Sequence, residues 1–195
     1  MLVLASSSPQ RAALLRSSGY RFRVVPPHPM AECGICSRET PGELVVRLAR
    51  QKGADVAEQL RREPSMGAGA THIVACDTVC QCGGQVLGKP ADRQHAQRML
   101  RMLSGRLHSV LSGLCVWPMG AVRPRSGVAE TTLRMDPLSP EQIEEYLDSG
   151  LWEGKAGAFG YQDRAGWLHV VAGSESNVIG LPLELLGEML ENREK

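Results

Sequence analysis

Three segments of the chain carry charged side chains in settings where they could act on a phosphate group. Asp77 follows the apolar run 72–76, so its carboxylate would stand at the end of a buried strand and could bind a divalent cation or orient water. Lys89 lies on the rigid turn GKP, from which an ammonium could reach phosphate. Lys155 begins a glycine-rich stretch whose backbone can approach a ligand closely. Taken singly, each also fits an ordinary turn or surface loop.

A serine-rich loop near the start of the chain could hold a phosphate with its backbone. The apolar run 2–5 predicts a buried strand, and Ser6-Ser7-Ser8 follows it. Ser8 is a typical N-cap, with Pro9 at the first helical position. A strand, a loop and a helix N-terminus in this order direct several N–H groups at one spot, where an anion is favoured.

The elements that position these side chains alternate between strands and helices, which predicts an α/β or α+β fold. Thr40-Pro41-Gly42-Glu43 is a capping box that begins a long helix carrying Lys52. Asp92 and Ser139 are further N-caps, and residues 154–162 form a loop. The expected strands are 2–5, 21–25, 72–76, 107–117, 128–135 and 167–172, and the last helix is 182–192.

Length and charge narrow the classes of function. The 195 residues suit a single domain, 1–195, and 43% apolar content is enough for a core. A net charge of +1 gives no global field that would attract a nucleic acid polymer or an anionic membrane. The apolar runs are too short for a membrane span or a signal peptide, so we expect a cytoplasmic protein.

The cysteines leave a zinc site open as an alternative, and the common phosphate-binding and hydrolase motifs are absent. Cys33 and Cys36 have CxxC spacing that could hold zinc in an interaction module, although no second pair with that spacing follows. Reduced thiols are the simpler interpretation of the six cysteines. The chain has no P-loop, no GxGxxG after a strand, no HExxH and no GxSxG motif.

Seven blocks of sequence, in order, resemble the Maf family of nucleoside triphosphate pyrophosphatases. The resemblance covers nearly the whole chain, and the series of blocks is specific although each block alone is weak. The blocks are LASSSPQR (4–11), ETPGELVVRLARQKG (39–53), VACDTV (74–79), LGKP (87–90), MLRMLSGRLHSV (99–110), KAGAFGYQ (155–162) and SNVIGLPL (176–183).

The resemblance implies hydrolysis of a nucleoside triphosphate to its monophosphate and pyrophosphate with Mg²⁺ or Mn²⁺. It also implies a curved mixed sheet flanked by helices, two lobes around a nucleotide cleft as in inosine triphosphatases, and a homodimer. Asp77 would be the catalytic acidic residue, which activates water or binds the metal, and Glu32 would be a second metal ligand. The residues that would bind the triphosphate are Ser6, Arg11, Lys52, Lys89 and Lys155.

Departures from the family pattern bear on base selection. Gln10 stands where the dTTP/UTP branch has arginine, while Thr78 and Gln162 match that branch. Two of three markers therefore favour dTTP and UTP over 7-methyl-GTP. Ala31 and Gly154 replace family acids, which leaves a nucleotide-binding regulator of septum formation with little turnover as an alternative.

Overall fold

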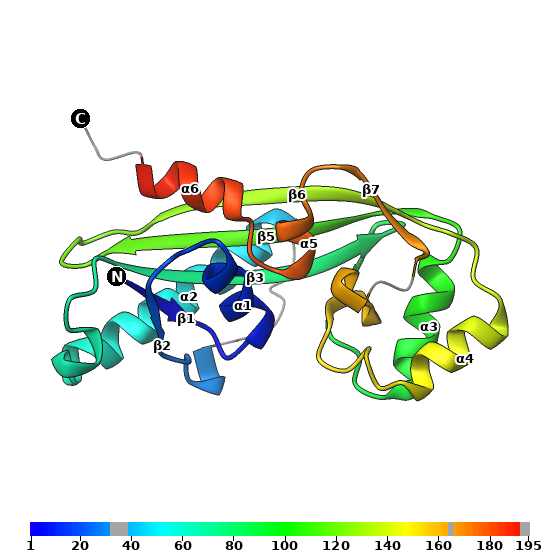
Figure 1. Ribbon diagram of the computed structural model, residues 1–195, viewed down its shortest axis with the longest axis horizontal. Coiled ribbons are helices and arrows are strands. Elements are labelled where there is room, and N and C mark those ends of the chain that lie inside the picture. Colours follow the sequence, from blue (N-terminus) through cyan, green and yellow to red (C-terminus); the bar gives the residue numbers. More distant parts are fainter. Residues whose placement is uncertain (32–38, 164–165, 192–195) are drawn as a thin grey trace. The chain divides into compact units, whose positions relative to one another are not determined.

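The computed structural model describes residues 1–31, 39–163 and 166–191, and the chain divides into two compact units (Figure 1). The first unit comprises Met1–Asp77, Ser112–Ala129 and Gly180–Lys195; the second comprises Thr78–Leu111 and Glu130–Ile179. The strands hydrogen-bond in the order β2-β1-β3-β5-β6-β7, and β4 pairs with β3. Parallel and antiparallel pairs both occur, so the predicted mixed α/β class is confirmed.

Most predicted elements are present, with ends close to those expected. The strands are β1 (Leu2–Ala5), β2 (Phe22–Val24), β3 (His72–Cys82), β4 (Gln85–Leu87), β5 (Leu107–Pro118), β6 (Arg125–Met135) and β7 (Leu168–Ala172). The helices are α1 (Pro9–Ser17), α2 (Pro41–Arg62), α3 (Arg93–Leu103), α4 (Pro140–Asp148), α5 (Glu175–Ile179) and α6 (Leu183–Glu191). Short 3-10 turns cover Pro29–Ala31, Pro64–Gly67, Ala156–Ala158 and Tyr161–Asp163.

The helix starts follow from the local capping chemistry. Ser8, Thr40, Asp92 and Ser139 each accept a hydrogen bond from a backbone N–H in the first turn of the helix that follows, which confirms all four predicted N-caps. Thr40 and Ser139 also form capping boxes with Glu43 and Gln142.

Parallel strands form the centre of the first unit, and each of their faces is covered. β1 pairs in parallel with both β2 and β3. Leu2 and Leu4 face a cluster that includes residues of α1 and α6, while Val3 and Ala5 face a cluster that includes α2. Burial on both faces explains why β1 is a continuous apolar run rather than an alternating one.

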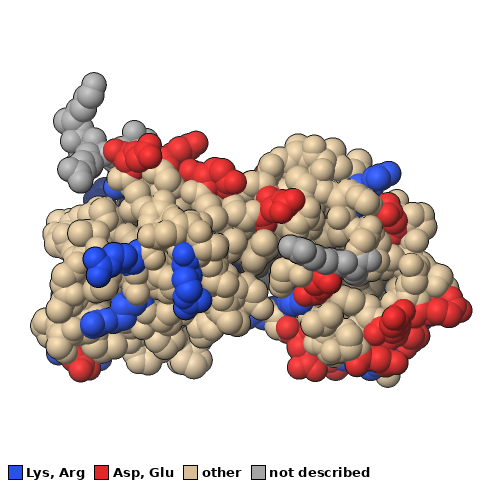
Figure 2. All heavy atoms as spheres, viewed as in Figure 1, with Lys and Arg blue, Asp and Glu red and all other residues tan. Residues whose placement is uncertain are grey.

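The second unit has its own core, built around α3, α4 and antiparallel strand pairs. Leu100, Leu103, Leu133 and Phe159 belong to this cluster. Arg93 of α3 bonds Glu144 and Asp148 of α4, which links the two helices at the surface. Acidic side chains gather over α4 on the face drawn in Figure 2.

One predicted strand end is wrong. The interpretation that the strand stops at Cys76 fails, because β3 continues to Cys82 and Asp77 lies within it. The extension is held by antiparallel pairing with β4, from Cys80 opposite Leu87 to Cys82 opposite Gln85. A separate finding is that no helix among the described residues has the length and apolar content needed to cross a membrane.

Candidate active site

Ser6 and Asp77 lie just beyond the point where the pairing of the parallel strands β1 and β3 ends. The register places Ala5 opposite Ala75, so β1 ends just before the level at which β3 reaches Asp77. Side chains alternate along a strand, so Asp77 points to the same face as Ala75, which packs in the α2 cluster. Ser6 is buried and begins the serine loop directly after β1. Asp77 thus lies beyond the end of its neighbour β1, although it lies inside β3.

Helix α2 brings Lys52 to Asp77. The Lys52 Nζ atom donates to Asp77 Oδ1 over 2.5 Å, and the two side chains are only 6% and 14% exposed. The helix lies unusually close to β5, since a Cβ added to Gly113 would stand 2.2 Å from the carbonyl carbon and oxygen of Val45. Gly113 therefore permits the contact of helix and strand that carries a lysine ammonium to the catalytic candidate.

Arg11 is held beside Ser6 by two hydrogen bonds. Its Nε donates to the carbonyl oxygen of Gly180 over 2.7 Å, and its Nη1 donates to Ser6 Oγ over 3.3 Å. The same Gly180 carbonyl also accepts from the Cys76 thiol. Gly180 has φ +120°, which a residue with a side chain rarely adopts. The block 176–183 thus supplies the backbone group that orients Arg11, a role that sequence reasoning missed.

Gln10 belongs to the same serine loop, where its side chain is already bonded. Ser8 Oγ donates to Gln10 Oε1 over 2.9 Å and also caps α1 by accepting from Arg11 N. The Ser8 N–H in turn donates to Ser6 Oγ. These bonds fix the first turn of α1, so Gln10 lies at the N-terminus of the helix beside Arg11.

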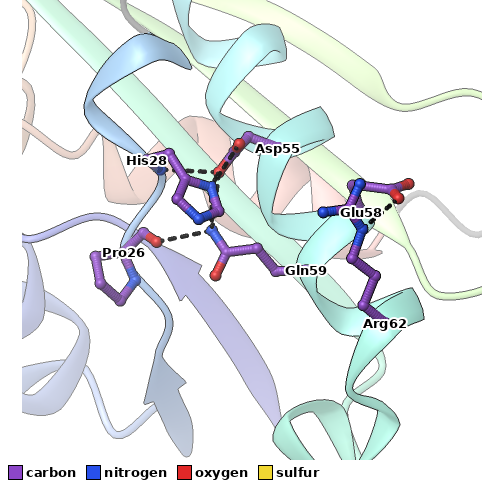
Figure 3. A network of polar contacts seen from close by, with 6 residues as sticks. All are labelled: Pro26, His28, Asp55, Glu58, Gln59 and Arg62. Atoms are coloured by element: carbon purple, nitrogen blue, oxygen red, sulfur yellow. Dashed lines mark hydrogen bonds and ion pairs between the residues drawn. The ribbon is translucent and has the colours of Figure 1, made fainter.

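A polar network anchors the segment that leads toward Glu32 (Figure 3). Asp55 of α2 accepts from the backbone N–H of His28 over 2.9 Å and bonds the imidazole of His28 over the same distance. Gln59 donates to Asp55 and to the Pro26 carbonyl. Burial raises the pKa of Asp55, but the bonds from His28 and Gln59 outweigh it and lower that pKa overall. Glu32 itself, like Cys33 and Cys36, lies outside the described residues.

Lys155 of the second unit forms a buried ion pair that the sequence did not predict. Its Nζ lies 2.6 Å from both carboxylate oxygens of Asp163, and the side chains are 14% and 5% exposed. Tyr146 of α4 donates its hydroxyl to the same carboxylate over 2.5 Å. Lys155 is therefore already bonded, and a phosphate would approach an ammonium that Asp163 holds in place.

The remaining candidates of the second unit lie on or beside this loop. The Gly157 N–H donates to the Gly88 carbonyl, which ties the loop to the turn that carries Lys89. Lys89 and Gln162 are exposed, and Thr78 follows Asp77 within β3. The structure thus groups Ser6, Gln10, Arg11, Lys52 and Asp77 in the first unit, and Thr78, Lys89, Lys155 and Gln162 in the second.

The donor set around Asp77 suits a hard divalent cation. Lys52 occupies Oδ1, and within residues 1–31, 39–163 and 166–191 no other side chain bonds this carboxylate. Mg²⁺ is commonly held by one or two carboxylates together with water and substrate phosphates, so a single carboxylate fits this mode of binding. No group of three or more His, Cys, Asp or Glu side chains in the described part of the chain forms a complete metal site. Among the described residues, the buried cysteines Cys76, Cys80, Cys82 and Cys115 form no disulfide bond.

Comparison with known families decides the assignment. The model of the Maf family, described as "Maf-like protein", matches residues 1–193. The chain belongs to the Maf family. The resemblance read from its seven sequence blocks is thereby confirmed.

Curated relatives of this Maf protein are similar over nearly its whole length. A dTTP/UTP pyrophosphatase of Rhodopirellula baltica is 50% identical over 195 residues, covering 100% of this chain and 82% of the relative. Enzymes of the same name from Symbiobacterium thermophilum and Thermococcus kodakarensis are 41% and 36% identical; they cover 97% and 98% of this chain, and 92% and 96% of their own lengths. The Staphylococcus aureus Ham1 protein has a similar fold, with a TM-score of 0.51, 9% identity and 97% coverage of both chains.

Proposed function

We propose that this Maf protein hydrolyses dTTP and UTP between the α- and β-phosphates, releasing the nucleoside monophosphate and pyrophosphate. The observation that carries the proposal is the buried Lys52–Asp77 pair at the level where β1 ends, with Arg11 held beside Ser6 in the same unit. Relatives named dTTP/UTP pyrophosphatase, 36–50% identical across nearly the whole chain, support the choice of substrate.

The side chains of the first unit divide the chemistry among them. Asp77 would accept a proton from the attacking water, and Lys52 holds its carboxylate in one orientation through Oδ1. The guanidinium of Arg11 is held beside Ser6 near the N-terminus of α1, where the helix dipole adds to its positive charge. Such a site stabilises the negative charge that moves onto the leaving pyrophosphate.

A divalent cation would complete this charge balance. Asp77 would hold it together with Glu32, and the cation would neutralise phosphate charge and favour ionisation of water when bound. Lys89 and Lys155 of the second unit are the candidates for further phosphate contacts. Because each lysine sits on a loop tied by the Gly157–Gly88 hydrogen bond, the two loops would respond together to a substrate.

Base selection would rest on Gln10, Thr78 and Gln162. A glutamine amide offers one acceptor and two donor hydrogens, which suits the edge of a pyrimidine. Ser8 Oγ donates to the Gln10 amide oxygen and holds that end of the amide, so the NH₂ group is the end that would meet a ligand. That arrangement favours an acceptor on the base, such as a carbonyl oxygen of thymine or uracil.

The test is a comparison of kcat/KM for dTTP, UTP, 5-methyl-UTP, CTP, GTP and 7-methyl-GTP, each with Mg²⁺ or Mn²⁺. We expect pyrophosphate release to be fastest from dTTP, UTP and 5-methyl-UTP. Preferred turnover of 7-methyl-GTP would refute the assignment of base. Tight nucleotide binding without pyrophosphate release in either metal would instead favour the nucleotide-binding regulator.

We also propose a cytoplasmic site of action, where nucleoside triphosphates are made, and a homodimer. Light scattering on the purified chain measures the mass directly, and a mass near 21.1 kDa would exclude the dimer.

A further inference from the structure

The carboxylate of Asp163 is the centre of a buried polar cluster in the second unit. Both of its oxygens lie 2.6 Å from Lys155 Nζ, and its side chain is only 5% exposed. A charge so far from water is stable only when it is paired and hydrogen-bonded. Lys155 provides the pairing, and Tyr146 provides a hydroxyl donor from the core-facing side of α4.

Tyr146 binds the loop as well as the carboxylate. Its hydroxyl oxygen accepts from the Gly160 N–H over 3.2 Å while its hydrogen goes to Asp163. Burial, followed by the bond to the carboxylate, raises the pKa of Tyr146, so the phenol stays a donor at any working pH. The ring is fixed by packing edge-on against Trp167, with centroids 5.4 Å apart. A rigid side chain therefore holds both ends of the segment 160–163.

The Gln162 amide lies near the same cluster, beside Gly160. A Cβ added to Gly160 would lie 2.6 Å from Lys155 Nζ, 2.7 Å from Asp163 Oδ2 and 2.9 Å from Gln162 Nε2. All three polar atoms thus surround one face of a single glycine. Gln162 lies between Gly160 and Asp163, the two residues that Tyr146 bonds, so the cluster fixes the backbone that carries this amide.

The acid that Lys155 bonds is not its neighbour in the sequence. In the motif that matches the family, Gly154 stands where an acid precedes the lysine, and Gly154 has no side chain to offer Lys155. Asp163 lies eight residues later in the chain, yet its carboxylate reaches the same ammonium.

We propose that Asp163 is a positioning residue for base selection: by bonding Lys155 and Tyr146 it fixes the loop segment that carries Gln162 and presents this amide to a pyrimidine base. This inference rests on the proposed hydrolysis of dTTP and UTP. Asp163 itself does not touch the substrate in this account, and its effect passes through the loop 155–162.

The test compares Asp163→Asn with Tyr146→Phe in the full chain, using steady-state kinetics with dTTP, UTP and CTP. Asp163→Asn removes the charge at nearly constant volume, and Tyr146→Phe removes one donor while keeping the ring. We expect KM for dTTP to rise roughly tenfold or more in Asp163→Asn, as misplacement of a substrate-orienting group does. The ratio of kcat/KM for UTP over that for CTP falls in the same variant, and Tyr146→Phe shows a smaller change in the same direction.

Glu153→Gln is the matched control. Glu153 is an exposed acid two residues before Lys155, so this variant makes the same charge change without touching the ion pair. It should keep the wild-type KM and the wild-type selectivity ratio. A merely structural role for Asp163 would lower the melting temperature and the rate with every nucleotide while leaving KM and the ratio unchanged, and this result would overturn the proposal.

The outcome separates this inference from the proposed function. If the wild-type chain releases no pyrophosphate from any nucleotide, the proposed function fails. If the wild type hydrolyses dTTP and Asp163→Asn is as selective as Glu153→Gln, the function stands and the positioning role fails.

Discussion

The buried Lys52–Asp77 pair allows a quantitative prediction about the first unit. Its charges are 2.5 Å apart and the side chains are 6% and 14% exposed, so water screens them little. Removing Lys52 leaves the buried Asp77 carboxylate without the ammonium that it bonds, and breaking a buried pair in this way typically costs about 3–5 kcal/mol of stability. Lys52→Met should therefore destabilise the chain within that range, and Asp77→Asn provides the second single variant of the cycle.

The double variant should be far less unstable than the sum of the two single variants. Once the Asp77 carboxylate is replaced by an amide, loss of the Lys52 ammonium no longer leaves a buried anion beside it. We expect the pair to show a coupling energy of about 2–3 kcal/mol in a double-mutant cycle. Urea unfolding followed by tryptophan fluorescence measures it, because Trp117 packs against the α2 cluster of the same unit.

An exposed pair on the same helix provides the control cycle. Glu58 and Arg62 form an i,i+4 ion pair, drawn in Figure 3, with side chains 39% and 77% exposed. Glu58→Gln with Arg62→Met should give a coupling energy below about 0.5 kcal/mol. Additivity within about 0.5 kcal/mol for Lys52 and Asp77 as well would refute the account of a strong buried pair.

Three further predictions concern the scaffold. Gly113→Ala should destabilise the chain by about 3 kcal/mol, because its Cβ would lie 2.2 Å from the Val45 backbone. As a control in the same urea assay, Gly187→Ala on α6, where an added Cβ meets open space, should be neutral or stabilising. Asp55→Asn should remove less than about 1 kcal/mol. Because folding lowers the pKa of Asp55, its contribution is present above about pH 4 and is lost as pH falls through the folded pKa, so wild type and variant should converge in acid melts. Burial lowers the pKa of His108, so the unfolded chain binds a proton more readily than the folded chain, and the free energy of unfolding falls as pH drops below about 6.5. His108→Gln should make the free energy of unfolding less dependent on pH in this range. An unchanged pH dependence would contradict a buried neutral imidazole.

Local chemistry explains which parts of the fold were predictable. The N-caps Ser8, Thr40, Asp92 and Ser139 act within four residues of chain, so sequence alone located the helix starts. The end of β3 depends on pairing with β4, which no local pattern specifies, and the prediction there was wrong. The five-residue helix α5 has too few residues for a periodic signal and was missed.

The candidate site was predictable to a similar depth. The expected strand end and the family motifs indicated that Asp77, Lys52 and Arg11 belong to the candidate site. The partner of Arg11 is a backbone carbonyl far along the chain at Gly180, and the partner of Lys155 is an acid eight residues later in the chain. Contacts of this kind depend on tertiary packing, and a lone aspartate in a loop gives no signal for them.

The most direct test of the proposed chemistry is product analysis of dTTP hydrolysis in ¹⁸O-labelled water, with Mg²⁺, for the wild type and Asp77→Asn. The account predicts equal amounts of dTMP and pyrophosphate from the wild type, with loss of that turnover in Asp77→Asn. Formation of dTDP and inorganic phosphate, or undiminished dTMP production by Asp77→Asn, would contradict it. The position of the label identifies which phosphorus the water attacks.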